Sequence, residues 1–120
     1  MKQKVHSVSY LAKAEFEFKN GVYDLVALPS GAEVVKVSLE VVGNPTVGKI
    51  SVGFKEEEDK KDYFFTLENI STHKNATSAK DYTATSNKVV VAEVKNTNGT
   101  DIKGVLRVLY FLPSVIEVEY

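Results

Sequence analysis

The chain contains no cysteine and no tryptophan among its 120 residues. Without cysteine it can form neither disulfides nor thiolate metal sites, and it has no thiol nucleophile. This absence fits assembly in a reducing cytosol. The two histidines, His6 and His73, have no carboxylate or second histidine near them in the sequence, and a metal ion needs several such ligands. No metal site and no cofactor are therefore expected.

An excess of charge of one sign is also absent, because 15 Lys and Arg residues oppose 16 Asp and Glu residues, for a net charge of −1. Domains that bind nucleic acid normally carry a basic excess, so neither nucleic acid nor an anionic membrane is an expected partner. No apolar run is long enough to span a bilayer, and the N-terminus lacks the apolar core of a signal peptide. If the product is complete, it is expected to start in the cytoplasm.

Catalytic signatures are missing as well. Hydroxyl residues are plentiful, but none lies in a Gly-x-Ser-x-Gly elbow or a similar context, so we expect no enzyme. Glu117 and Glu119 share one face of a predicted strand, where such neighbours usually face solvent rather than a cleft. The charged run 55–62 lacks the ligand spacing and the glycine of a calcium loop, and it is predicted to be a solvated hairpin loop.

What the sequence does contain is a repeated alternation of apolar and polar residues. The clearest example is the segment 33–42. A strand points successive side chains to opposite faces, so one face is predicted to be apolar and the other polar. The apolar face would hold Val35, Val37, Leu39 and Val41. The polar face would hold Lys36, Ser38 and Glu40. This pattern predicts a half-buried β-strand.

Similar strands are predicted along most of the chain, and no window has helical periodicity. They span residues 13–18, 22–28, 33–42, 50–54, 63–67, 82–85, 89–94, 102–112 and 115–120. Asn20-Gly21 and Asn98-Gly99 are typical hairpin turns, Pro29-Ser30-Gly31 predicts a further turn, and the polar tract 71–87 predicts a long surface excursion.

These features predict an all-β chain that folds as an antiparallel β-sandwich, jelly-roll-like, with about eight strands. The length and the 43% hydrophobic content suit one compact domain. We expect an extended N-terminal arm over residues 1–12 and a single β-sandwich domain over residues 13–120.

The strand 102–112 is apolar on both faces, and such a strand must be covered on both sides. One face holds Leu106, Val108, Tyr110 and Leu112. The other holds Val105, Leu109 and Phe111. The second face is covered either by a loop or by a subunit or partner, and the sequence leaves both open. The terminal strand 115–120 raises the same question, because an edge strand offers unpaired backbone groups to a neighbour. The candidate interface residues are Val105, Leu109, Phe111, Val115, Ile116, Val118 and Tyr120.

The order of these segments resembles that of small structural proteins of tailed bacteriophages. The likeness lies in Leu28-Pro29-Ser30-Gly31-Ala32 with the alternating valines that follow, in the glycine-containing strand 51–54, and in the valine and tyrosine strands 88–91 and 105–110. It covers about residues 22–112. The resemblance implies a virion protein made in the host cytoplasm, and more narrowly a capsid decoration or cement protein that binds the major capsid protein lattice, often as a homotrimer.

A carbohydrate-binding or receptor-binding β-sandwich is the alternative function. Sugar recognition uses exposed aromatic rings flanked by amides, which Tyr63, Tyr82 and Asn75 would supply. The absence of tryptophan weakens this reading. A monomer that binds glycans would favour it, whereas a stable trimer without glycan binding would favour the cement protein.

Overall fold

The structure is a computed structural model and describes residues 1–55, 60–98, 101–113 and 115–119. Within these ranges the chain forms strands joined by turns and loops, with no α-helix and hence no helix able to cross a membrane. Every paired strand runs antiparallel to its neighbour. The prediction of an all-β antiparallel sandwich is confirmed, although the strands number 11 rather than about eight.

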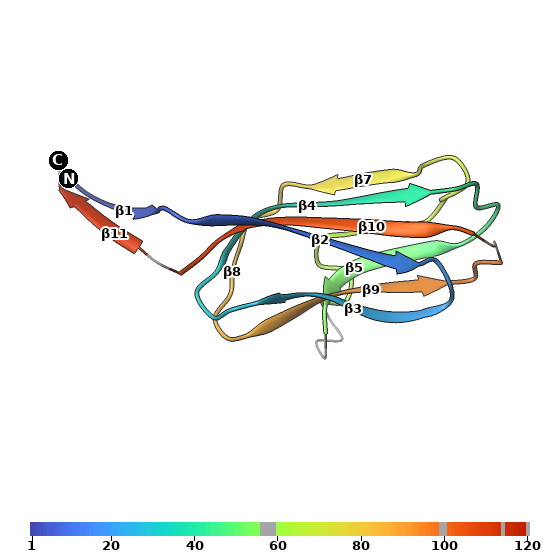
Figure 1. The fold of residues 1–120 in the computed structure, drawn as a ribbon, viewed down its shortest axis with the longest axis horizontal. Coiled ribbons are helices and arrows are strands. Elements are labelled where there is room, and N and C mark those ends of the chain that lie inside the picture. Colours follow the sequence, from blue (N-terminus) through green and yellow to red (C-terminus); the bar gives the residue numbers. More distant parts are fainter. Residues whose placement is uncertain (56–59, 99–100, 114, 120) are drawn as a thin grey trace.

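The strands form two facing sheets and a separate ribbon (Figure 1). Their bounds are β1 Lys2–His6, β2 Ser9–Glu17, β3 Gly21–Leu28, β4 Glu33–Val42, β5 Lys49–Phe54, β6 Phe65–Leu67, β7 Asn75–Ser78, β8 Tyr82–Thr83, β9 Lys88–Lys95, β10 Lys103–Phe111 and β11 Val115–Glu119. The five-stranded sheet has the order β2-β10-β4-β7, and β8 pairs with β4 as well. The four-stranded sheet has the order β3-β9-β5-β6, and β1 pairs with β11 in the ribbon.

The core lies between the two sheets, where apolar side chains of alternate residues meet. Val37, Leu39 and Val41 of β4 are at most 4% exposed, as the alternation predicts. Opposite them, β5 contributes its own set of fully buried apolar side chains, Ile50, Val52 and Phe54. Among the described residues, the only buried polar side chain is that of Ser78. The sandwich is therefore held together mainly by apolar burial.

One residue of β4 lies on the other side from the one predicted. The pairing of β10 with β4 shifts between Leu109, opposite Lys36, and Tyr110, opposite Val34. Val35 is the extra residue of this β-bulge, and a bulge reverses the alternation beyond it. Val34 is consequently buried in the core, while Val35 lines a groove with Phe111. The prediction that Val35 faces the core was wrong.

The two Asn-Gly turns do not close hairpins, and that prediction was also wrong. β2 and β3 belong to different sheets, and so do β9 and β10. Both connections cross the sandwich at the same end, where the Phe18 amide donates to the Ile102 carbonyl (2.9 Å) and the Thr97 amide donates to Asn20 Oδ1 (2.9 Å). Gly99 lies outside the described residues. A turn dipeptide allows the chain to reverse, but it does not specify which sheet the next strand joins.

Other predicted connections agree with the structure. At the turn 29–31 the Ala32 amide donates to the Pro29 carbonyl (3.1 Å), and Gly31 has φ +88°, which glycine adopts readily. The charged run 55–62 joins β5 to β6, which are paired antiparallel neighbours, so it spans a hairpin as predicted, although residues 56–59 lie outside the described ranges. The tract 71–87 contains two short strands, of which β7 was not predicted.

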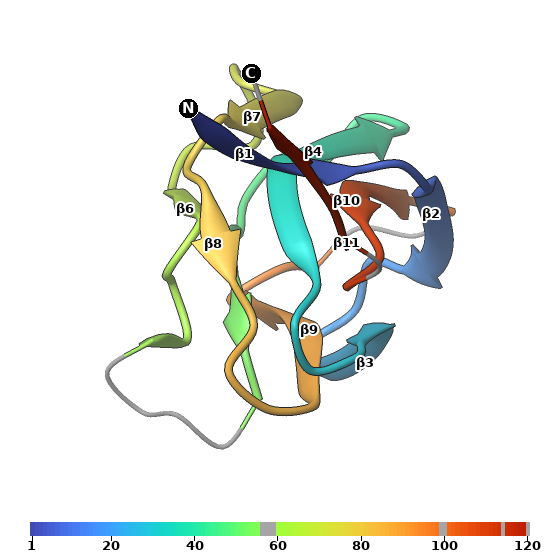
Figure 2. The ribbon, with the colours of Figure 1, turned by 90° about the vertical axis from the view of Figure 1, so that its left-hand side faces the viewer.

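The ribbon of β1 and β11 extends from one end of the sandwich and carries both chain termini (Figures 1 and 2). It contributes to an elongated shape of 55 × 24 × 18 Å. Between the ribbon and the sandwich, the Leu112 amide donates to the Val8 carbonyl (2.8 Å), and this hydrogen bond continues the pairing of β2 with β10 toward the ribbon. The expected boundary between an arm and a domain at residues 12 and 13 stays a prediction.

Candidate functional site

The side of β2, β10 and β4 that is turned away from the core is called here the outer face. Its residues lie in rows across the three strands, because directly paired residues share a face of the sheet. The rows are Leu11 with Leu109 and Lys36, Lys13 with Arg107 and Ser38, and Glu15 with Val105 and Glu40. The row nearer the ribbon is the more apolar, and its Leu11 is 61% exposed.

A groove of about 280 Å³ crosses this face, and we call it the basic groove. Its walls are Leu11 and Leu109, with Lys36, Ser38 and Arg107 beside them. The Arg107 guanidinium donates to Glu40 Oε1 at 3.3 Å. Within the described parts of the chain, no carboxylate lies within ion-pair distance of Lys36 or of the neighbouring Lys13. The basic groove thus combines apolar walls with two cations, of which Arg107 is paired with Glu40 and Lys36 has no carboxylate partner among the described residues.

A second groove, of about 490 Å³, lies where the outer face meets the ribbon, and we call it the acidic groove. It is lined by Val35 and Phe111, with Glu33, Asp81 and His6 around them. Glu33 accepts a hydrogen bond from the Thr83 hydroxyl (2.7 Å). His6 Nδ1 lies 3.1 Å from the Leu112 carbonyl oxygen, and since a carbonyl only accepts, this nitrogen carries the proton. Phe111 follows Leu109 by two residues, so both grooves lie on one face.

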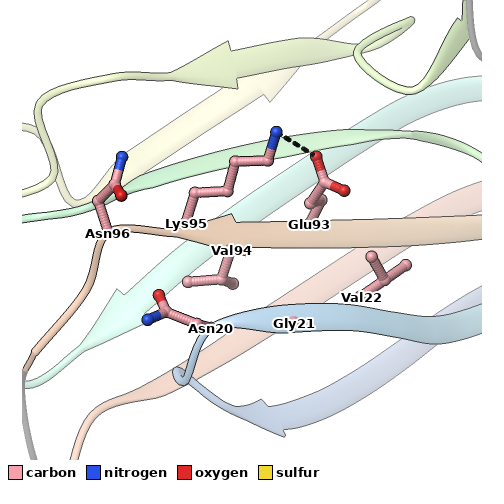
Figure 3. Close-up of a pocket in the computed structure, with 7 residues that line it drawn as sticks. All are labelled: Asn20, Gly21, Val22, Glu93, Val94, Lys95 and Asn96. Carbon is pink, nitrogen blue, oxygen red and sulfur yellow. Dashed lines mark ion pairs between the residues drawn. The ribbon is translucent and has the colours of Figure 1, made fainter.

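The outward side of the four-stranded sheet differs, because it carries two local ion pairs. Lys55 Nζ lies 2.7 Å from Asp24, and Lys95 Nζ lies 3.2 Å from Glu93. A shallow depression of about 370 Å³ lies at the end of β3 and β9 (Figure 3). Its lining is Asn20, Gly21, Val22, Glu93, Val94, Lys95 and Asn96. It offers amides and one ion pair, and it does not hold a nucleophile beside a base.

The ribbon has two unlike faces. Lys2 pairs with Glu119 and Lys4 with Glu117, so these charges share one face, where the N-terminal ammonium lies 3.5 Å from Glu119 and Lys2 lies 3.8 Å from Glu117. The opposite face presents Gln3, Val5, Ile116 and Val118. Ile116 is 55% exposed. A two-stranded ribbon alone is marginally stable in water, so additional contacts on its apolar face would stabilise it.

Those of the predicted interface residues that the structure describes lie on the outer face and on the ribbon. Val105, Leu109 and Phe111 lie on the outer face, opposite in sense to the core-facing Leu106, Val108 and Tyr110 of the same strand. Val105 is only 6% exposed and lies between Glu15 and Glu40. Ile116 and Val118 lie on the apolar face of the ribbon, Val115 pairs with His6 in β11, and Tyr120 lies outside the described residues. Their role as an interface stays a prediction.

Sequence reasoning missed Leu11, Lys13 and Lys36 as members of the same surface. One signal was available in the sequence: Leu11 is apolar, although it lies on the same outward face of β2 as the charged residues Lys13 and Glu15. Lys13 and Lys36 lie on different strands and become neighbours of Arg107 only because β10 lies between β2 and β4.

The residues suggested for sugar binding do not form one platform. Tyr63 and Tyr82 pack edge to face (5.4 Å between ring centroids) and against Phe54, so their rings are part of the edge of the core. Asn75 pairs with Glu40 on β4, whereas Tyr82 pairs with Val34. Six residues of strand separate those positions, which is about 20 Å. The described residues contain no group of three or more His, Asp or Glu that could hold a metal ion.

Solved structures that resemble the chain include two phage capsid structures. No protein-family model matches the chain, and no curated protein sequence does. A chain in the acid-stable capsid structure of Helicobacter pylori bacteriophage KHP30 is 74% identical, with a TM-score of 0.91 and coverage of 100% of both chains. A chain in the capsid asymmetric unit of cyanophage Pam1 has a TM-score of 0.69 and 21% identity, over 90% of this chain and 87% of that one. The second match shows a shared fold.

Proposed function

The chain belongs to the family of phage virion structural proteins represented in the KHP30 capsid, and from this premise we propose that it is a capsid decoration, or cement, protein. In this role it binds the lattice of the major capsid protein and catalyses no reaction. The observation that carries the proposal is the 74% identity to a capsid chain over the full length of both. The core lies between the chain's own two sheets, so the protein can fold first and attach afterwards.

We also infer that the sandwich is a jelly roll. Four strands in the order β2-β10-β4-β7 face four in the order β3-β9-β5-β6. Successive strands of the sandwich cross from one sheet to the other, apart from the paired neighbours β5 and β6 and from β7 and β8, which both pair with β4. Two four-stranded sheets connected in this way are the arrangement of an eight-stranded jelly roll. Such a scaffold is rigid and leaves the outer face and the ribbon for contacts.

Attachment would use the outer face and the ribbon, which hold the predicted interface residues. A homotrimer would present three copies of each contact, and simultaneous binding would raise the overall affinity through effective concentration. We therefore propose a trimer as the form that binds the lattice.

The decisive experiment mixes purified protein with shells assembled from the major capsid protein of the encoding phage. We expect co-sedimentation that saturates at a fixed ratio, a trimer by light scattering, and shells that resist heat better after binding. Absence of co-sedimentation would reject the proposal. A monomer that ignores the shells and binds a glycan array would establish the carbohydrate-binding alternative instead.

Acid tolerance is a further property that we propose for this chain, since the KHP30 capsid is described as acid-stable. Acid unfolds proteins largely by protonating carboxylates that the native state holds charged, or by charging buried histidines. Here the only buried polar side chain among the described residues is Ser78, which does not titrate. The far-ultraviolet circular dichroism spectrum should therefore be the same at neutral pH and at about pH 3, which is below the ordinary carboxyl pKa values. Loss of the β-type spectrum at the acid pH would contradict this.

A further inference from the structure

The outer face is polarised along β10. At the basic groove, Lys36 and Lys13 have no carboxylate partner among the described residues, and Arg107 shares its charge with Glu40 alone. At the acidic groove, Glu33 and Asp81 flank apolar side chains instead. A negative and a positive region of this surface are thus separated by a short apolar stretch, and the row of Glu15 and Glu40 lies beyond the positive region.

The spacing of the grooves suits an extended peptide. Leu109 is in the basic groove and Phe111 in the acidic groove, and two residues along a strand are about 7 Å apart. An extended segment lying along β10 would therefore place side chains two positions apart over the two grooves. The apolar stretch between the charges is Leu11, Leu109, Phe111 and Val35.

From this geometry we propose that the two grooves bind one extended segment of the major capsid protein, with a carboxylate over the basic groove and, two residues along, a cation over the acidic groove, the apolar stems of these side chains lying on Leu109 and Phe111. This rests on the proposed function and specifies the chemistry of the partner. Complementary charges set the register and orientation of such a segment, while the apolar contact contributes affinity.

A threefold oligomer would not place the outer face against the outer face of a second copy. Around a threefold axis, each subunit contacts its neighbour through two different patches, so a face is not laid against itself. The outer face would match a second copy only through a twofold contact that sets a basic groove against an acidic one. The outward side of the other sheet is a poorer candidate for the lattice, because Asp24 with Lys55 and Glu93 with Lys95 already neutralise each other.

Charge reversal on the outer face tests the proposal with the same capsid shells. Lys36→Glu should weaken shell binding about tenfold, because a like charge then faces the partner's carboxylate, and Asp81→Lys should do the same at the other groove. Lys103→Glu is the matched control, because Lys103 also lies on β10 and is exposed, but it pairs with Glu17 at the far end of the sheet. It should change binding less than about twofold, and wild-type binding should weaken as salt is raised.

The outcomes separate this inference from the proposed function. All variants should keep the wild-type circular dichroism spectrum, because the altered side chains are exposed. If the wild type does not bind shells, both proposals fail. If the wild type binds and Lys36→Glu and Asp81→Lys bind equally well, the decoration role stands and the segment model is overturned. If these variants bind normally but lose the oligomer in light scattering, the face is a contact between copies and the segment model is likewise overturned.

Discussion

Gly104 of β10 provides a quantitative test of the packing in this sandwich. It lies directly opposite Phe16 of β2, and both residues are buried. A Cβ atom at position 104 would overlap the Phe16 ring. That ring is confined, since its centroid lies 5.1 Å from the Tyr23 ring and 6.4 Å from the Phe18 ring. We therefore predict that Gly104→Ala destabilises the protein although alanine is small and apolar.

The magnitude follows from two opposing effects. Forcing a methyl group into a filled core typically costs about 1–3 kcal/mol. Replacing glycine by alanine also restricts the unfolded chain, which stabilises by about 0.4–1 kcal/mol where the backbone is compatible, and Gly104 has no positive φ. The net loss in the free energy of unfolding should be about 1–2 kcal/mol. In a Phe16→Leu background the ring is gone, so Gly104→Ala should be close to neutral.

The assay is urea denaturation of the two single variants and the double variant at one fixed protein concentration, followed by far-ultraviolet circular dichroism. We expect a coupling energy of about 1–2 kcal/mol between positions 16 and 104. The control combines Gly104→Ala with Phe18→Leu, because the three atoms nearest to the new methyl group all belong to Phe16 and none to Phe18. In this background Gly104→Ala should still destabilise the protein. Equal destabilisation by Gly104→Ala in the wild-type and Phe16→Leu backgrounds would refute the reasoning.

Three further predictions concern the ribbon, a surface ion pair and a turn. Deleting residues 115–120 removes the partner of β1 but no core strand, so the β-type spectrum should persist while light scattering shows a weakened oligomer; an unchanged oligomer would contradict this. The pKa of Glu17 lies below 4.5, first because Lys19 donates a hydrogen bond to it and second because of the positive charge of Lys19. The ion pair therefore stabilises the folded protein at pH values above the ordinary pKa, and this stabilisation is lost as the pH falls through the lowered pKa. Glu17→Gln should therefore lower the melting temperature slightly at neutral pH and not in acid, and an equal effect at both pH values would argue against the ion pair. Gly31→Ala should cost about 1–2 kcal/mol in urea denaturation, because φ is +88° and the new Cβ would lie 2.7 Å from Pro113 Cβ; an unchanged midpoint would exclude that strain.

The parts of the fold that could be predicted are those where burial determines the pattern. β4 runs over Glu33–Val42, the span indicated by its alternation, because its core face must be apolar along its whole length. β7 was missed because Asn75–Ser78 has no large apolar residue and becomes a strand by pairing with β4. The β-bulge at Val35 was also invisible, since it depends on the register with β10. The pairing of two distant segments cannot be predicted from either segment alone.

The residues of the candidate site also differ in whether the sequence could predict them. Leu109 and Phe111 could be recognised because a strand that is apolar on both faces demands cover on both faces, and this is a local property of β10. The cations around them could not, since Lys13 and Lys36 are separated from Arg107 by most of the chain and meet only through the order β2-β10-β4. The apolar character of this surface can therefore be predicted from one strand, whereas the charges around it depend on which strands are neighbours in the sheet. A chain that kept the alternation but exchanged the neighbours of β10 would still fold around an apolar core, yet it would present different charges on its outer face.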